Sequence, residues 1–173
     1  MTQPPLLAFV GAGRWQLSAI ECARDQGIRS LAIDGDPNAP GLARADLHLV
    51  VDIRDPQAVL DAVLNVGLDI HGAIAIANET GMAAAAALRE HFGLVGPDRR
   101  TTQALCHKAK QRMIWGRAGL PNPRWLHIEH RDDASLALGI VGLPAIAKPV
   151  DSAGSRGVRV IRRMREQRDA ADH

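Results

Sequence analysis

Residues 147–158 of this chain read Ala147-Lys148-Pro149-Val150-Asp151-Ser152-Ala153-Gly154-Ser155-Arg156-Gly157-Val158. An apolar run from Leu143 precedes the segment and the alternating Val158–Ile161 follows it, so the pattern predicts a β-hairpin with a loop of small residues. Glycines allow positive φ angles, and such a loop can fold over an anion with its N–H groups turned inward. A solvated hairpin with one surface lysine explains the same composition equally well.

Composition and charge set the first limits on function. With 46% hydrophobic and 23% charged residues, the 173-residue chain is expected to fold around a core, as one domain or one domain and part of a second. A net charge of +2 and 3% aromatic residues argue against a nucleic-acid surface. No apolar run approaches the roughly 18 residues of a membrane span. Cys22 and Cys106 show no metal-ligand spacing, which favours a reducing cytoplasm.

The N-terminal stretch has the pattern of a strand, a glycine turn, a helix and a second strand. The apolar run Leu6–Val10 predicts a buried strand that leads directly into Gly11-Ala12-Gly13. Residues at helical spacing then continue as far as Gly27, namely Trp15, Ala19, Ile20 and Ala23. A second strand is expected at Ser30–Asp34.

Gly11, Gly13 and Asp34 partly match a dinucleotide fingerprint. In that fingerprint the glycine turn places N–H groups at a helix N-terminus, and an acidic residue about 20 positions later binds the ribose. Gln16, however, occupies the position of the third glycine. Two interpretations therefore stay open: an NAD-type Rossmann module, and a tight strand-to-helix turn without a ligand.

Strands and helices continue to alternate after this unit. Strands are expected at Leu47–Val51 and Gly72–Ala77, and helices from Asp55-Pro56 and from Asn78-Glu79-Thr80 to His91. The order predicts an α/β fold with an open, parallel, Rossmann-like sheet. Because such sheets bind ligands at the carboxyl ends of their strands, Gly11, Asp34 and the pair Asn78-Glu79 are expected to share one crevice. Glu79 is either a substrate ligand there or a first-turn acid that complements the helix dipole.

A change in character near residue 96 predicts a domain boundary. One helix, capped by Thr101 or Thr102 and carrying Lys108 and Lys110, is expected to run to Gly116. The glycine and the prolines that follow it forbid its continuation.

We therefore expect three parts. An α/β domain spans 1–96, a linker helix and connector span 97–123, and an incomplete α+β subdomain spans 124–173. Within the last part the pattern predicts a strand at 124–128, a weak helix at 132–138, the glycine hairpin and a charged tail.

Several short motifs follow one another in a fixed order along nearly the whole chain. They are Phe9-Val10-Gly11-Ala12-Gly13, Ala32-Ile33-Asp34-Gly35-Asp36-Pro37, Ala43-Arg44-Ala45-Asp46, Gly96-Pro97 with Lys108, Ala118-Gly119-Leu120-Pro121-Asn122-Pro123, and Ala147-Lys148-Pro149 with its loop. Each motif alone is weak, but the whole set in this order resembles the N-terminal part of the ATP-grasp ligases. That part is shared by biotin carboxylase-like and purine-biosynthetic members of the superfamily.

The resemblance implies an ATP site. Lys108 and Lys148 match the two lysines that contact ATP phosphates in the family, and Lys110 is a neighbouring alternative to Lys108. The mobile loop over those phosphates corresponds here to Ser152, Gly154, Ser155, Arg156 and Gly157. Members of the family use ATP to activate a carboxylate as an acyl phosphate, which an amine or similar nucleophile then attacks. The first domain would help to bind that small-molecule carboxylate or amine, with Gly11, Gly13, Asp34 and Glu79 as candidates.

The metal ligands of the family have no match in this sequence. A later subdomain supplies them in the family, and no carboxylate pair of suitable spacing follows Ile161 here. We therefore expect Mg²⁺ and catalysis only with a missing C-terminal half, and we assign no catalytic or metal-binding residue. A fragment, a truncated product or a subunit completed by a second polypeptide fits this expectation. A non-catalytic, ligand-sensing subunit is the remaining alternative.

Overall fold

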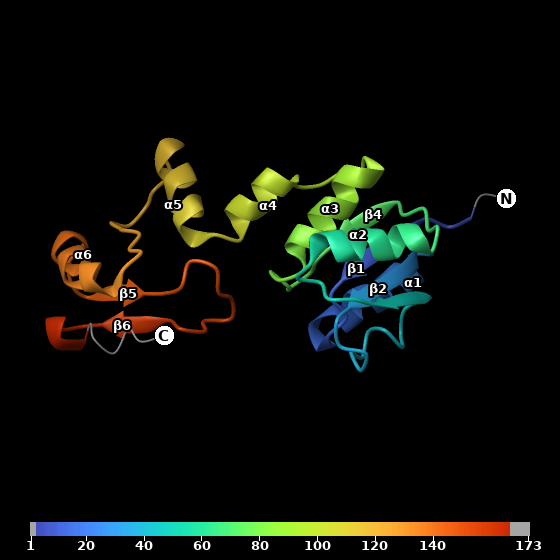
Figure 1. Ribbon diagram of the computed structural model, residues 1–173, viewed down its shortest axis with the longest axis horizontal. Helices are drawn as coiled ribbons and strands as arrows, with labels where there is room; N and C mark the ends of the chain where they lie inside the picture. The colour runs from blue at the N-terminus through green and yellow to red at the C-terminus, as the bar shows by residue number, and fades with distance from the viewer. Residues whose placement is uncertain (1–2, 167–173) are drawn as a thin grey trace. The chain divides into compact units, whose positions relative to one another are not determined.

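The computed structural model describes residues 3–166, and the chain divides into two compact units, Met1–Gln103 and Ala104–His173 (Figure 1). The division falls inside the predicted linker 97–123, while the exact three-part division stays a prediction. The end of the predicted third part, 167–173, lies outside the described residues. Within 3–166 no helix is both long enough and apolar enough to cross a membrane.

The first unit is built on a four-stranded sheet, which confirms the predicted parallel α/β architecture. The strands lie in the order β3-β2-β1-β4, and every neighbouring pair is parallel. Their bounds are β1 Leu6–Val10, β2 Arg29–Asp34, β3 Leu47–Val50 and β4 Gly72–Ile74. The helices are α1 Leu17–Asp25, α2 Pro56–Asn65 and α3 Met82–Phe92 (Figure 1).

The central strands β1 and β2 are buried on both faces because their alternate side chains enter two separate cores. Ala8 and Val10 of β1 pack in one cluster with residues of α2 and α3, including Val63 and Leu88. Phe9 packs in the other cluster with residues of α1, including Ile20. A strand covered on both faces needs apolar residues at nearly every position, which explains the continuous apolar run of β1.

The carboxyl end of the sheet differs from the sequence-based expectation. β4 ends at Ile74 instead of Ala77, and α3 begins at Met82 instead of the Asn78–Thr80 region. Ala77 has φ +48°, a left-handed conformation that cannot continue a strand. Trp15 was expected on the apolar face of the first helix, but it lies in a short 3-10 turn and its side chain is 78% exposed.

The second unit contains helices and one hairpin. Its elements are α5 Lys108–Arg117, α6 Ala134–Val141, β5 Ala145–Ala147 and β6 Arg159–Ile161, and α4 Arg99–Leu105 contains the division between the units. β5 and β6 pair antiparallel, with Ile146 opposite Val160, so the predicted hairpin is confirmed. Short 3-10 turns occur at Arg131–Asp133 and Met164–Glu166.

Two expectations for this part of the chain are wrong. The strand expected at 124–128 does not form, because a strand needs a partner and no described strand pairs with this segment. The single helix expected up to Gly116 is instead two helices, α4 and α5. Thr101 and Thr102 lie inside α4 rather than capping it, and a carboxylate oxygen of Asp98 accepts the Thr101 N–H at 2.7 Å.

Candidate functional site

The glycine loop connects β5 to β6 through two successive turns. The first is closed by the Arg156 N–H, which donates to the Ala153 carbonyl at 3.4 Å. Its central residues, Gly154 and Ser155, have φ +64° and +60°, as in a type I′ turn. Gly157, in the second turn, has φ +71°. Positive φ at Ser155 costs energy for a residue with a Cβ atom, and such strain concentrates at functional sites.

The two ends of the loop approach each other closely. A Cβ atom on Gly157 would lie 2.7 Å from Cγ of Pro149, closer than real Cβ contacts. Glycine is therefore required here both for its φ angle and for space.

Lys108 is joined to the same loop, 44 positions away from Ser152 in the sequence. Its backbone N–H donates to the Val150 carbonyl at 2.8 Å, and its ammonium group donates to the Ser152 carbonyl. The side chain of His107 accepts the Lys110 N–H at 3.3 Å and so caps the helix that Lys108 begins. The structure thus brings together the start of α5 and the glycine loop, the two segments that the family resemblance assigns to one site.

Lys148 is the second lysine that the family resemblance assigns to the site. It directly follows β5 and begins the loop, and its side chain is exposed, whereas that of Lys108 is half-buried. Among residues 3–166, no three His, Cys, Asp or Glu side chains cluster closely enough to hold a metal ion. Besides backbone groups, the loop and the start of α5 carry Lys148, Arg156 and Lys108, together with the exposed Asp151.

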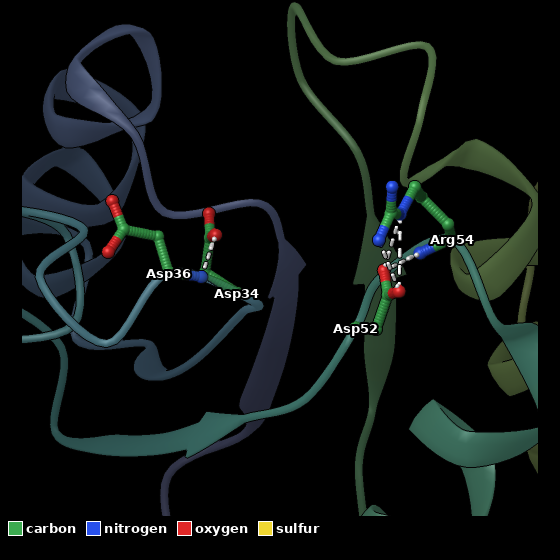
Figure 2. Close-up of polar contacts among 4 residues, drawn as sticks. All are labelled: Asp34, Asp36, Asp52 and Arg54. Atoms are coloured by element: carbon green, nitrogen blue, oxygen red, sulfur yellow. Dashed lines mark hydrogen bonds and ion pairs between the residues drawn. The ribbon is translucent and has the colours of Figure 1, made fainter.

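Asp34, a candidate ligand in the first unit, holds the backbone around it. One carboxylate oxygen accepts the Ala12 N–H at 2.7 Å and the other accepts the Asp36 N–H at 3.0 Å. Figure 2 shows the second of these bonds at the end of β2. The Gly11 N–H donates to the Ile33 carbonyl at 2.7 Å. Two N–H groups of the first glycine turn are thus used within the protein itself.

Asn78 and Gln16 shape this turn through contacts that the sequence did not predict. Gly11 has φ +102°, and a Cβ atom on it would lie 2.2 Å from Nδ2 of Asn78. Gln16 is buried, donates to the Ile76 carbonyl at 2.5 Å, and places its Oε1 3.2 Å from where a Cβ atom on Gly13 would stand. The signals in the sequence were the place of Asn78 after a strand at the same edge as Gly11, and the glutamine at the third glycine position of the fingerprint. Glu79 lies in the segment between β4 and α3 and is exposed.

The next loop at this edge of the sheet carries an ion pair. Asp52 and Arg54 follow β3, and the Arg54 guanidinium contacts the Asp52 carboxylate at 2.7 Å (Figure 2). Hydrogen bonds from the Arg54 side chain, and then from its backbone, lower the pKa of Asp52 to about 2. Both side chains are well exposed, so the pair orders the loop without adding much to stability.

Several solved structures share the fold of this chain over nearly its whole length. A phosphoribosylglycinamide synthetase from Anaerococcus prevotii matches 96% of this chain and 41% of its own, with 27% identity and a TM-score of 0.69. An L-amino acid ligase from Bacillus licheniformis matches 99% of this chain and 42% of its own, with 20% identity and a TM-score of 0.81. The chain has the fold of the N-terminal part of the ATP-grasp ligases.

A third solved ATP-grasp structure shares this fold. The biotin carboxylase domain of a 2-oxoglutarate carboxylase from Hydrogenobacter thermophilus, crystallised with MgADP, ADP and bicarbonate, matches 98% of this chain and 40% of its own. Its identity is 21% and its TM-score 0.72. At that identity the likeness shows the fold alone.

Curated relatives agree with the ATP-grasp assignment. An uncharacterised protein, y4rH, from Sinorhizobium fredii is 29% identical over 160 residues, which make up 90% of this chain and 33% of that protein. A formate-dependent phosphoribosylglycinamide formyltransferase from Burkholderia thailandensis is 29% identical over 159 residues, or 89% of this chain and 38% of the enzyme. No family model matches the chain. The chain thus spans little more than a third of the length of these relatives.

Proposed function

We propose that this chain binds ATP through Lys108, Lys148 and the glycine loop, as part of an ATP-grasp ligase. The observation that carries the proposal is the contact of Lys108 with the loop, through Val150 and Ser152. The family resemblance assigned this lysine and this loop to the same phosphates on sequence alone. Their meeting in one compact unit supports that assignment.

The chemistry of the loop fits the phosphates of a nucleotide. A charge-assisted hydrogen bond contributes roughly 1.5–3 kcal/mol, so two ammonium groups form a substantial part of an anion site. Ser152, Ser155 and Arg156 add hydroxyl and guanidinium donors, and Gly154 and Gly157 let the backbone approach closely. ATP bound there would supply the phosphoryl group for activating a carboxylate.

The acceptor substrate is proposed to bind at the carboxyl edge of the first sheet. Ligands of open parallel sheets lie at this edge, and Gly11, Gly13, Asp34 and Glu79 all follow the ends of strands there. Since both oxygens of Asp34 hold backbone N–H groups, we assign Asp34 to positioning the turn. The substrate class stays that of the superfamily, a small carboxylate or an amine.

We also place the chain in the cytoplasm, because Cys22 and Cys106 show no metal-ligand spacing.

We propose that ligation also needs further polypeptide. It would correspond to the part of the relatives that this chain does not match. The chain spans 33% and 38% of the two relatives described above, and the residues 3–166 hold no cluster for Mg²⁺. Ile146 and Val160, paired across the hairpin, are 64% and 50% exposed, which suits a surface that further polypeptide covers. That polypeptide belongs either to the same protein or to a second subunit.

The NAD-type alternative is less well supported by the geometry of the first unit. A dinucleotide site needs N–H groups of the glycine turn aimed at the pyrophosphate. Here the Gly11 N–H bonds the Ile33 carbonyl and the Ala12 N–H bonds Asp34. Gln16 also fills the space that a third glycine would leave open.

Titration of the 173-residue chain with ATP and with NAD, each with and without Mg²⁺, tests the proposal. We expect ATP to bind at least about tenfold more tightly than NAD, a difference of about 1.4 kcal/mol. Isothermal titration calorimetry measures both affinities directly. Tighter binding of NAD, or no binding of ATP under any of these conditions, would refute the proposed function.

A further inference from the structure

The half-buried ammonium group of Lys108 has a partner that its assignment to ATP does not explain. It donates to the backbone carbonyl of Ser152, an atom of the glycine loop. Lys110, two positions later in the same helix, is exposed. The contact therefore links the lysine to the loop through groups of the chain itself.

A second contact comes from the backbone of the same residue. The Lys108 N–H donates to the Val150 carbonyl at 2.8 Å. In a continuous helix this N–H would bond the carbonyl of Ala104, four residues earlier. The break between α4 and α5 therefore frees an N–H that holds the beginning of the loop, and a side-chain substitution at Lys108 leaves this bond in place.

The chemistry of an ammonium group allows one lysine to serve two partners. It has three N–H donors and no acceptor. One donor bonds Ser152, and the other two are available to phosphate oxygens. A single side chain can therefore connect the nucleotide to the backbone of the loop that covers it.

We propose that Lys108 is a positioning residue that holds the glycine loop through the Ser152 carbonyl. The loop is then already shaped when ATP arrives, which reduces the ordering cost of binding. The link to ATP rests on the proposed function, but the contact with the loop does not. The two claims can therefore fail separately.

Amide hydrogen exchange, followed by NMR on the 173-residue chain without nucleotide, tests the positioning role. The reporters are Arg156 and Val158, whose N–H groups bond Ala153 and Ser155 within the loop. Lys108→Met removes the ammonium donors while keeping a long side chain. We expect these two amides to exchange about tenfold faster in Lys108→Met, because the loop loses a charge-assisted bond. The matched control Lys110→Met should leave both rates unchanged.

Two further measurements separate positioning from simple loss of structure. Amides of the β5–β6 pairing should keep their wild-type rates in Lys108→Met, and Lys108→Arg, which retains charged donors, should give loop rates between those of wild type and Lys108→Met. Unchanged loop rates in Lys108→Met, equal acceleration of the β5–β6 amides, or loop rates in Lys108→Arg equal to those of Lys108→Met would each overturn the proposal. Loop acceleration together with an absence of ATP binding would support the positioning role and reject the proposed function.

Discussion

Single polar side chains hold the loops of the first unit, and Asp46 shows how. One of its carboxylate oxygens accepts the Ser30 N–H at 2.7 Å and the Ser30 hydroxyl at 2.9 Å. The Asp46 N–H in turn donates to the Ser30 hydroxyl oxygen at 3.1 Å. The backbone bond from Ser30 is the largest cause that lowers the pKa of Asp46 from 3.8. The charged form is therefore stabilised in the folded chain.

This pKa predicts a pH dependence of stability. Because the folded pKa lies below the unfolded value of 3.8, the ionised carboxylate stabilises the fold above pH 3.8. That contribution is lost as the pH falls through the folded pKa. We expect wild type to melt at a higher temperature than Asp46→Asn near pH 6, and the difference to shrink below about pH 3.8. A melting-temperature difference that stays constant into this acid range would contradict the assignment.

At the residue scale, the sequence predicted where a residue lies in the fold better than which residues it contacts. Glycine at position 11 was expected for a tight turn, and its φ of +102° agrees. Asn78 was expected at the same edge of the sheet, but its close contact with Gly11 was not predicted, because that contact depends on the pairing of β1 and β4. Asp34 was likewise found at the right edge of the sheet, but its bond to Ala12 depends on tertiary structure.

Among the elements, α3 is joined to β4 and to the following connector by one buried arginine. Arg89 donates to the Ala73 carbonyl at 2.8 Å and twice to the Pro97 carbonyl, at 3.0 and 2.8 Å. Burial lowers the pKa of Arg89 below its ordinary value. Gly96 fits around this side chain, since a Cβ atom there would lie 2.6 Å from Cδ of Arg89.

Replacing this arginine should destabilise the first unit strongly. Arg89→Leu leaves the carbonyls of Ala73 and Pro97 without their donor, and we expect a loss of about 3 kcal/mol of unfolding free energy. The control Arg99→Leu removes only an exposed ion pair with Glu90, worth less than about 1 kcal/mol. Urea denaturation of both variants measures the two losses. Equal losses would show that Arg89 does not join these elements.

The sequence predicted most elements but not the break between α4 and α5. The helical pattern continues through Cys106 and His107, so one helix was expected. At the break, the Lys108 N–H bonds the Val150 carbonyl, which lies far along the chain. Only the capping side chain of His107 was local, and histidine is not a common cap. The missing strand at 124–128 has the same explanation, since pairing partners are not visible locally.

For the whole molecule, the order of short motifs was more informative than any of them alone. The α/β sheet and the glycine hairpin agree with the structure, and the likeness to ATP-grasp ligases covers 96–99% of the chain in the matches described. The roles of Lys108, Lys148 and the loop stay predictions. Their arrangement in one unit makes a specific claim about ATP that can be measured.

The most direct measurement is calorimetric titration of ATP into wild type, Lys148→Ala and Lys110→Ala. Lys148 begins the loop, and loss of a charge-assisted phosphate contact of about 1.5–3 kcal/mol should weaken ATP binding at least about tenfold. Lys110, the neighbouring alternative to Lys108, is exposed, and since we assign the phosphate contact to Lys108, Lys110→Ala should bind as wild type does. Equal ATP affinity in wild type and Lys148→Ala would contradict the account.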